Sequence, residues 1–320
     1  MHQPIEQLPS QHLLDRCAEA WRLRHFTFVR KMENIVYACD SDQGKVFLRL
    51  TTPLRRTRAE IEAELNWIAH LATCGLNVPR LRVDKNGNQI LSLTEGPHHY
   101  EAVAFSEIVG VHPNKETASD PKFLKTLGTL IGKMHLASQC YDSAHQGAKR
   151  EEWFEERGLR HALTAAASSD QTALRKRLED AVSWMKQLSR SLENYGLVHA
   201  DLGALNLFIG EDSAISIIDF DDSCYHWFAF DLAIVIFSMA GRFGHAAQNQ
   251  EEEMWLAHLL EGYRTVLPID DKEISLIPKF IDFSCLRLFF WIEHHEKLNT
   301  FHKDALEKVA QQKQWLMGRL

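Results

Sequence analysis

Long apolar runs are absent from this sequence. The two most apolar stretches, residues 228–240 and 280–292, are shorter than the ~18 apolar residues that a membrane-spanning helix needs. Both also carry charge, with Asp231 in the first stretch and Asp282 and Arg287 in the second. We therefore expect two buried helices of a globular protein, and no membrane partner.

A signal peptide and a cysteine framework are also absent. The first residues, MHQPIEQLPS, lack the charged start and the apolar core of a secretory signal. No two cysteines have the short spacing of zinc motifs, and disulfide frameworks are typical of small secreted chains. The six cysteines stand at positions 17, 39, 74, 140, 224 and 285. These features predict reduced thiols and a cytoplasmic protein.

The chain has no excess of basic residues. Its net charge is −7 and its pI is near 6.2, so no overall positive surface indicates a nucleic-acid partner. Its 17 histidines do not form the H-E-x-x-H pattern that sets two metal ligands one helical turn apart. The composition therefore disfavours nucleic-acid binding and a histidine-based metal site.

Residues 1–107 combine extended and helical patterns. Segments with the alternation of β-strands flank one helical stretch, which begins after Thr57 and carries apolar residues at helical spacing. A polar turn joins two of the extended segments, 35–39 and 45–50, as a hairpin. We predict a small N-terminal lobe of five strands and one helix, preceded by a short helix over residues 11–22.

Residues 108–320 have a mainly helical pattern, with apolar residues recurring on one face of each expected helix. These helices are expected near residues 123–134, 174–188, 229–240, 252–265 and 273–297. A polar stretch near residues 163–171 indicates a loop. The predicted fold class is α+β, with a small antiparallel lobe and a larger helical lobe joined at about residues 106–110.

Polar residues gather around a short apolar hairpin between positions 199 and 219. Asn206 enters its first strand, the turn lies at residues 210–213, and Asp219 follows its second strand. Because a hairpin brings its open ends together, Asn206 and Asp219 become neighbours, with Asp201 in the loop just before them. One such residue alone would be an ordinary turn residue. Three at this spacing indicate an oxygen-ligand site that suits Mg²⁺.

The same segment matches a known catalytic pattern. The spacing H-x-D-x-x-x-x-N at residues 199–206, with Asp-Phe further on, is that of the kinase catalytic loop and its metal-binding aspartate. With the I-D-F and D-L-A patterns at residues 218–220 and 231–233, it resembles the aminoglycoside phosphotransferase and choline kinase superfamily. This superfamily includes homoserine-kinase-type enzymes. The resemblance implies a two-lobed, protein-kinase-like fold.

The resemblance also implies a role for each matching residue. Asp201 is expected to be the catalytic base that accepts the proton of the attacking hydroxyl, with Asn206 and Asp219 as the metal ligands. Asp231 is expected to brace the catalytic loop. We expect a structural, hydrogen-bonding role for His199 rather than proton transfer. ATP and Mg²⁺ are thus the expected cofactors.

Two positions depart from the family pattern. Ala200 stands where glycine is usual, and Gly203 stands where a second histidine is usual. Alanine is tolerable at position 200 unless the backbone there needs a positive φ. Gly203 removes a side chain that could orient the loop or a substrate. Because neither departure alters the expected base or metal ligands, an active enzyme is still expected.

The N-terminal lobe offers a cation for the phosphates of ATP. Alternation in the strand 45–50 places Arg49 on one face with Phe47, and Arg49 stands where protein kinases carry their strand lysine. On the following helix, Glu64 precedes Trp-Ile, similar to the family's E-x-x-W-L pattern. Glu60 is its rival one turn earlier. We expect Arg49 to pair with Glu64.

A glycine-rich phosphate loop is absent from this lobe. Between the first two strands the sequence has Glu33-Asn34-Ile-Val-Tyr, which resembles the family's shorter E-N-x-V-Y turn. Asn34 suits a tight turn whose backbone amides can reach phosphate. The resemblance also implies that adenine lies against the connection after the last strand of the lobe, at Ser106 and Ile108.

The segment after Asp219 bears on the acceptor. Eleven residues separate it from Asp231, and no A-P-E motif appears, so little platform exists for a peptide substrate. A small hydroxylated acceptor is therefore favoured. Its candidate binding residues are Asp221, Asp222 and Trp227, because carboxylates beside aromatic rings suit a cationic amino alcohol or an aminosugar.

Three alternatives stay open. Aromatic residues at helical spacing are more often core residues than ligands. A Ser/Thr protein kinase of the same superfamily is a second possible function. A catalytically weak, nucleotide-binding pseudokinase is a third, and it predicts the loss of Asp201 or Asp219, both of which are present.

Overall fold

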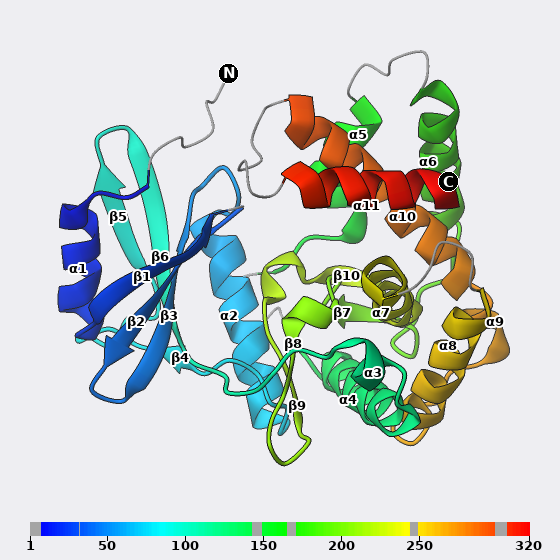
Figure 1. Cartoon of the computed structure of the whole chain (residues 1–320), viewed down its shortest axis with the longest axis horizontal. Helices are drawn as coiled ribbons and strands as arrows, with labels where there is room; N and C mark the ends of the chain where they lie inside the picture. Colours follow the sequence, from blue (N-terminus) through cyan, green and yellow to red (C-terminus); the bar gives the residue numbers. More distant parts are fainter. Residues whose placement is uncertain (1–7, 32, 143–148, 165–170, 244–248, 298–305) are drawn as a thin grey trace. The chain divides into compact units, whose positions relative to one another are not determined.

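Two compact units make up the chain in the computed structural model, which describes residues 8–31, 33–142, 149–164, 171–243, 249–297 and 306–320. Unit 1 comprises residues 1–109 and 142–149. Unit 2 comprises residues 110–141 and 150–320. Figure 1 shows that a sheet forms the centre of unit 1 and that unit 2 is mainly helical.

Unit 1 is built on an antiparallel sheet with strand order β1-β2-β3-β6-β4, in which β5 also pairs with β6. The strands are β1 (Arg24–Lys31), β2 (Ile35–Ser41), β3 (Gly44–Thr51), β4 (Leu81–Arg82), β5 (Leu91–Glu95) and β6 (His98–Ser106). The predicted hairpin between β2 and β3 is confirmed. The predicted count of five strands is one too low, because the sheet has six strands, and β5 pairs with the first half of β6.

Two helices cover the two faces of this sheet (Figure 1). The helix α1 (Gln11–Trp21) shares one buried cluster with Leu48 and Leu50 of β3. The helix α2 (Arg58–Thr73) lies against the opposite face, where Arg49 reaches it, because alternate residues of a strand point to opposite faces. At β3, one face of the sheet is therefore apolar, and the other face carries the charged residue Arg49.

Unit 2 contains most of the helices. They are α3 (Lys115–Ala118), α4 (Pro121–Gln139), α5 (Arg157–Thr164), α6 (Thr172–Met185), α7 (Phe228–Phe243), α8 (Asn249–Tyr263), α9 (Asp271–Ile274), α10 (Ile277–Lys297) and α11 (Leu306–Arg319). Glycine allows α4 and α8 to pack backbone against backbone. A Cβ on Gly128 would lie 1.9 Å from the carbonyl oxygen of Leu259, and one on Gly262 would lie 1.8 Å from that of Lys125.

The two most apolar stretches form buried helices, as predicted. They lie in α7 and α10, whose apolar side chains are mostly buried. The predicted helix 273–297 is interrupted after Ile274, and α10 begins at Ile277, with Pro278 in a first turn where its missing N–H removes no helical bond. No helix among the described residues is both long and apolar enough to cross a membrane. The loop expected at residues 163–171 lies largely outside those residues.

Two short antiparallel strand pairs lie between α6 and α7. The strand β7 (Tyr195–Val198) pairs with β10 (Cys224–Trp227), and β8 (Leu207–Ile209) pairs with β9 (Ile215–Ile217). The second pair confirms the predicted hairpin. Short 3₁₀ turns flank it, namely η4 (Ala204–Asn206) before β8 and η5 (Phe220–Asp222) after β9.

Candidate functional site

The β8–β9 hairpin closes with Asn206 and Asp219 at its open end, as the sequence predicted. Leu207 pairs with Ile217, and the backbone N–H of Ile218 donates to the carbonyl oxygen of Asn206 over 2.9 Å. Asp219 follows directly, and its left-handed backbone (φ 67°) turns the chain out of the strand into η5. Aspartate is one of the few residue types that adopt this conformation readily.

Asp231, in the first turn of α7, holds the loop between β7 and η4. Its buried carboxylate accepts hydrogen bonds from the backbone N–H groups of His199 (3.0 Å) and Ala200 (2.8 Å). Backbone N–H groups that lose water on burial need such partners. The carboxylate therefore fixes the direction of the loop that carries Asp201.

His135 and Tyr263, which sequence analysis did not single out, support Asp231 from two other helices. The Nε2–H of His135 donates to the Asp231 carboxylate (3.1 Å), and the Tyr263 hydroxyl donates to Nδ1 of His135 (2.9 Å). This tautomer follows because a carboxylate can only accept. All three side chains are buried. No spacing along the chain links α4, α7 and α8, so only helix packing reveals this network.

His199 occupies a structural position. Its Nε2–H donates to the carbonyl oxygen of Ile218 (2.9 Å), and its Nδ1 accepts the backbone N–H of Asp201 (3.2 Å). The residue is fully buried. Because both ring nitrogens are engaged, His199 ties the loop to the end of β9 and has no nitrogen with which to exchange a proton.

Asn206 contacts Asp201 directly. Its side-chain NH₂ group donates to the backbone carbonyl of Asp201 (2.7 Å) and to the Asp201 carboxylate (2.9 Å). With its nitrogen so used, Asn206 retains its amide oxygen as a possible ligand atom. Hard oxygen donors of this kind fit a magnesium ion.

The Asp201 side chain is exposed but lies among other carboxylates. Reduced hydration among the surrounding protein atoms, together with the negative charges of Asp222 and Asp219, raises the pKa of Asp201 to about 7. The positive charge of Arg287 opposes this rise. A carboxylate with a pKa near neutrality is a better proton acceptor than an ordinary aspartate.

The two departures from the family pattern have different structural settings. Ala200 has a φ of 66°, so alanine stands in the left-handed region that favours glycine, the condition under which the substitution carries strain. Gly203 has an ordinary φ of −86°. A Cβ at position 203 would lie 2.8 Å from the hydroxyl oxygen of Ser238, to which Ala204 N–H donates over 3.3 Å. Ser238 thus occupies space that a larger residue 203 would need.

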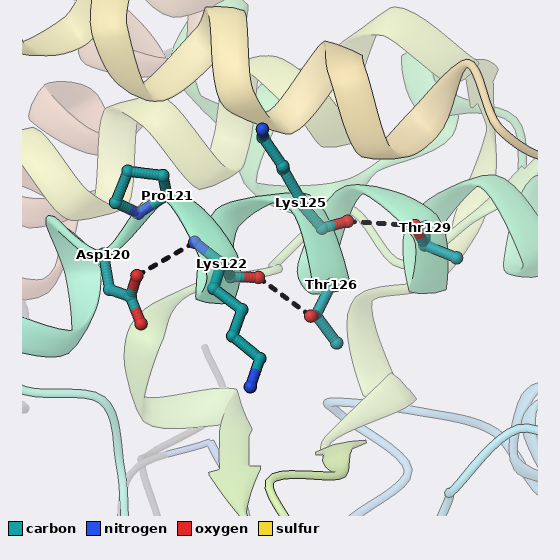
Figure 2. Close-up of a pocket in the computed structure, with 6 residues that line it drawn as sticks. All are labelled: Asp120, Pro121, Lys122, Lys125, Thr126 and Thr129. Carbon is teal, nitrogen blue, oxygen red and sulfur yellow. Dashed lines mark hydrogen bonds between the residues drawn. The ribbon is translucent and has the colours of Figure 1, made fainter.

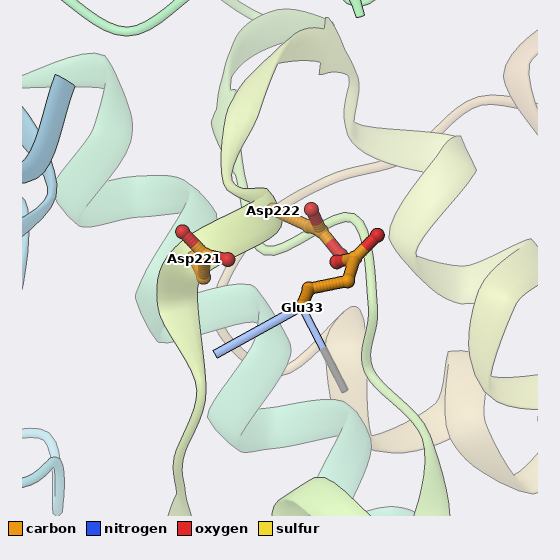
Figure 3. Close-up of side chains that lie close together, drawn as sticks. All are labelled: Glu33, Asp221 and Asp222. Atoms are coloured by element: carbon orange, nitrogen blue, oxygen red, sulfur yellow. The ribbon is translucent and has the colours of Figure 1, made fainter. Parts of the chain in front are cut away.

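Asp221 and Asp222 follow Asp219 in η5, and their side chains point in different directions (Figure 3). Asp221 is buried and Asp222 is half-buried. The buried guanidinium of Arg150 donates to the backbone carbonyls of Ser223 (2.7 Å) and Asp221. Arg150, which sequence analysis missed, therefore fixes the chain after Asp219.

Trp227 is a core residue. It is fully buried, its indole N–H donates to the carbonyl oxygen of Ser189 (2.9 Å), and its ring lies 5.0 Å from that of Tyr195 and 5.9 Å from that of Trp153. The prediction that Trp227 binds the acceptor is wrong, because β10 directs this side chain into the core of unit 2.

In unit 1, Arg49 and Glu64 form the predicted pair. Two bonds of 2.7 Å join the guanidinium to both carboxylate oxygens, and the side chains are only 9% and 1% exposed. The rival Glu60 instead caps α2, where its carboxylate accepts the backbone N–H of Thr57 (2.7 Å). A bidentate pair of this kind holds the guanidinium in one orientation.

The other expected nucleotide contacts lie at the ends of two strands of the unit 1 sheet, before β2 and at the end of β6. Asn34 sits in the bend before β2, where its amide oxygen accepts the hydroxyl of Thr51 (2.8 Å). At the end of β6, the N–H of Ser106 already donates to the carbonyl oxygen of Arg80 (2.9 Å). The expected contact with adenine then falls to the carbonyl of Ser106 and the backbone of Ile108, and it stays a prediction.

An open depression of about 590 Å³ lies along the first turns of α4 (Figure 2). Asp120 caps the helix there by accepting the N–H of Lys122 (2.9 Å), and Thr126 donates to the carbonyl oxygen of Lys122 (2.8 Å). None of its lining residues belongs to the loop or the hairpin described above. We therefore give it no part in the candidate site.

Comparison with known proteins also indicates a phosphotransferase. A model of the phosphotransferase enzyme family matches residues 25–269. The amicoumacin kinase of Bacillus subtilis (strain 168) is 27% identical over 287 residues, which cover 88% of this chain and 84% of that kinase. A homoserine kinase of Rhodopseudomonas palustris (strain TIE-1) is 28% identical over 284 residues, with coverage of 87% and 83%.

A solved structure shows the same similarity in three dimensions. The amicoumacin kinase hAmiN, in complex with AMP-PNP, Ca²⁺ and Ami, is 25% identical to this chain. The two structures superpose with a TM-score of 0.85, over 98% of this chain and 94% of that one.

Proposed function

This chain belongs to the phosphotransferase enzyme family, and from its site we propose that it transfers the γ-phosphate of ATP to a hydroxyl group of a small molecule, with Mg²⁺ as the metal. It is a small-molecule kinase with the α+β fold of the kinases it resembles. The observation that supports the proposal most is the hairpin of unit 2. It sets Asn206 and Asp219 at one open end, and Asn206 bonds to Asp201.

In this proposal Asp201 is the general base. It accepts the proton of the acceptor hydroxyl while that oxygen bonds to the γ-phosphorus, and the bond from that phosphorus to the bridging oxygen of ADP breaks. Asn206 donates to Oδ2 of Asp201 and so helps to orient the carboxylate for this step. The raised pKa of Asp201 favours this transfer.

Asn206 and Asp219 are the proposed magnesium ligands. Bound Mg²⁺ would neutralise the charge that builds up on the phosphates during transfer. The solved relative holds AMP-PNP, an ATP analogue, together with Ca²⁺, which supports a nucleotide with a divalent cation. In unit 1, Arg49, held by Glu64, is the proposed cation for the ATP phosphates.

The remaining nucleotide contacts are proposed on the family resemblance. The turn that contains Asn34 covers the phosphates, and the backbone at Ser106 and Ile108 binds adenine. A cytoplasmic location, where ATP is available, is part of the proposal and is supported by six cysteines that are all free.

A small acceptor is proposed in preference to a protein. Between Asp219 and Asp231 the chain forms η5 and β10 and then enters α7, so these residues are used within unit 2 and leave no long segment to hold a peptide. The relatives above are named for small molecules, amicoumacin and homoserine. A pseudokinase is disfavoured, because Asp201, Asn206 and Asp219 are all present.

An ADP-release screen over hydroxylated amines, amino acids, aminoglycosides and sugars tests the proposal. We expect at least one small acceptor to be turned over, and Asp201→Asn to lower kcat by about 10²–10⁴-fold, the usual contribution of a positioned base. Removal of Mg²⁺ with a chelator should abolish turnover, and added Mg²⁺ should restore it.

The matched control is Asp180→Asn, because this exposed carboxylate pairs only with the neighbouring Lys176 of α6 among the described residues. It should retain full activity. Phosphorylation of a protein substrate, with no turnover of any small molecule, would contradict the proposal.

A further inference from the structure

His161 of α5 and His294 of α10 meet at a helix contact that the proposed mechanism does not use (Figure 1). Their ring centroids lie 3.8 Å apart, and the two ring planes are inclined by 50°. Because the pair joins two helices, no spacing along the chain, such as H-E-x-x-H, could reveal it.

A second contact, one helical turn earlier, holds the two helices in the same register. A Cβ on Gly158 would lie 3.9 Å from the indole of Trp291, so the α5 backbone packs against this ring. His161 follows Gly158 by three residues and His294 follows Trp291 by three, and residues three apart share one face of a helix. The packing of α5 on α10 therefore brings the two histidines together.

The nitrogens of both rings are available to a ligand. Neither ring makes a hydrogen bond or an ion pair with any other residue that the structure describes. His161 is exposed and His294 is half-buried, so a hydrated ion can reach the pair. Burial, followed by the charges of His161 and Lys297, lowers the pKa of His294. Its imidazole is therefore neutral at pH ~7, the form in which histidine binds metals.

We propose that His161 and His294 together bind one divalent transition-metal ion of the Zn²⁺ and Ni²⁺ type, with water in the remaining coordination positions. The bound ion holds α5 against α10. This site shares no residue with the proposed magnesium ligands Asn206 and Asp219, and it does not depend on the proposed kinase function.

The chemistry of the pair selects this class of ion. Imidazole suits Zn²⁺, Ni²⁺ and Cu²⁺, whereas Mg²⁺ and Ca²⁺ prefer oxygen ligands. Zn²⁺ holds imidazole nitrogens at about 2.0–2.1 Å, so two of them on one tetrahedral ion lie about 3.3 Å apart. Rings that already touch reach this span by rotation of their side chains. Lys297 is a nearby positive charge that opposes the ion, but it is exposed, so water and salt screen it.

Metal binding by the whole chain tests the inference. Equilibrium dialysis against Zn²⁺ or Ni²⁺ is performed with excess Mg²⁺, which competes for oxygen-ligand sites. Other histidines and cysteines also bind these ions, so the readout is the difference between wild type and variant. We expect His161→Gln and His294→Gln each to bind about one ion fewer per chain, because two linked imidazoles hold an ion much more tightly than one.

The double variant distinguishes one shared ion from two separate ions. With a shared ion it loses no more binding than either single variant, whereas two independent sites lose additively. Thermal denaturation gives a second measure. Saturating Zn²⁺ should raise the wild-type Tm by about 2 °C or more, and each variant should show a smaller rise. Comparison of each variant with and without the ion removes the effect of the substitution on stability itself.

His12→Gln is the control, since His12 is an exposed histidine of α1 in unit 1. It should bind as many ions as the wild type. If either single variant of the pair also binds as many ions as the wild type, or if the two losses add, His161 and His294 make only an aromatic contact and the inference is wrong. ADP formation has no part in this readout, so failure of the kinase proposal would leave the test intact.

Discussion

Two neighbouring regions of unit 2 differ in how completely their polar groups are paired. The loop network consists of His135, His199, Asp231 and Tyr263. The hydrogen bonds that Asp231 and His135 make within it are 2.8 to 3.1 Å long. The second region is the pair of Arg287 and Glu156. Both side chains are half-buried, and the ion pair between them spans 3.4 Å.

This difference indicates which region has a fixed geometry and which region tolerates substitution. A buried, fully bonded network holds the backbone of the catalytic loop in one geometry, which a base needs if it is to meet a hydroxyl at the right distance. A half-buried ion pair at 3.4 Å costs less to change. The two regions should therefore respond very differently to substitution.

The largest effect on stability is expected from the loop network. The Asp231 carboxylate accepts hydrogen bonds from three N–H groups. In Asp231→Asn only one oxygen remains to accept them, and the new NH₂ group, which is itself a donor, faces other donors. Bonds to a charged group contribute about 1.5–3 kcal/mol each, so we expect a loss of about 3 kcal/mol. Urea denaturation measures it.

Two comparisons bound this expectation. The exposed Asp180→Asn should change the free energy of unfolding by less than about 0.5 kcal/mol. Arg287→Gln should cost less than about 1 kcal/mol, because its ion pair spans 3.4 Å and both side chains are partly exposed. If Arg287→Gln is as destabilising as Asp231→Asn, the contrast between the two regions does not hold.

A smaller effect is expected from pH, through His226 in β10. Burial, followed by the charge of Arg287, lowers the pKa of His226 well below its usual value near 6.5. The unfolded chain then binds a proton below pH ~6.5 that the folded chain does not, so stability falls as pH falls. At pH ~5.5 this linkage amounts to about 1.4 kcal/mol.

Removal of the titrating ring checks the sign. His226→Phe retains an aromatic ring in the stack with Phe230, whose centroid lies 3.7 Å away. Thermal denaturation between pH ~5.5 and ~7.5 should show a shallower loss of stability at low pH than in the wild type. Equal pH dependence of the two proteins would show that His226 is not held neutral.

The same contrast explains what the sequence could predict. Asn206 and Asp219 are joined by a short hairpin, and Arg49 and Glu64 by one strand and one helix, so local patterns predicted both arrangements. His135 reaches Asp231 from a different helix 96 positions away. Packing between helices determines this contact, and no spacing in one sequence encodes it.

The surroundings of Arg287 and of Trp227 were the least predictable part for the same reason. Arg287 and Glu156 lie 131 positions apart. Trp227 was predicted to bind the acceptor because an aromatic ring beside carboxylates suits a cationic group, but the pairing of β10 with β7 turns it into the core. Proximity along the chain indicates a shared site only where a tight turn or a hairpin enforces it.

The smallest expected effect tests whether the catalytic loop carries strain. Ala200 has a φ of 66°, and the left-handed region costs alanine about 1–2 kcal/mol, part of which glycine loses again through its freer unfolded chain. Ala200→Gly should therefore raise the free energy of unfolding by about 0.5 kcal/mol. Ala204→Gly, at an equally buried alanine whose φ is not positive, should lower it by a similar amount. If both variants are destabilised alike in urea, alanine is not strained at position 200, and the hydrogen bonds of Asp231 hold the loop without opposing strain.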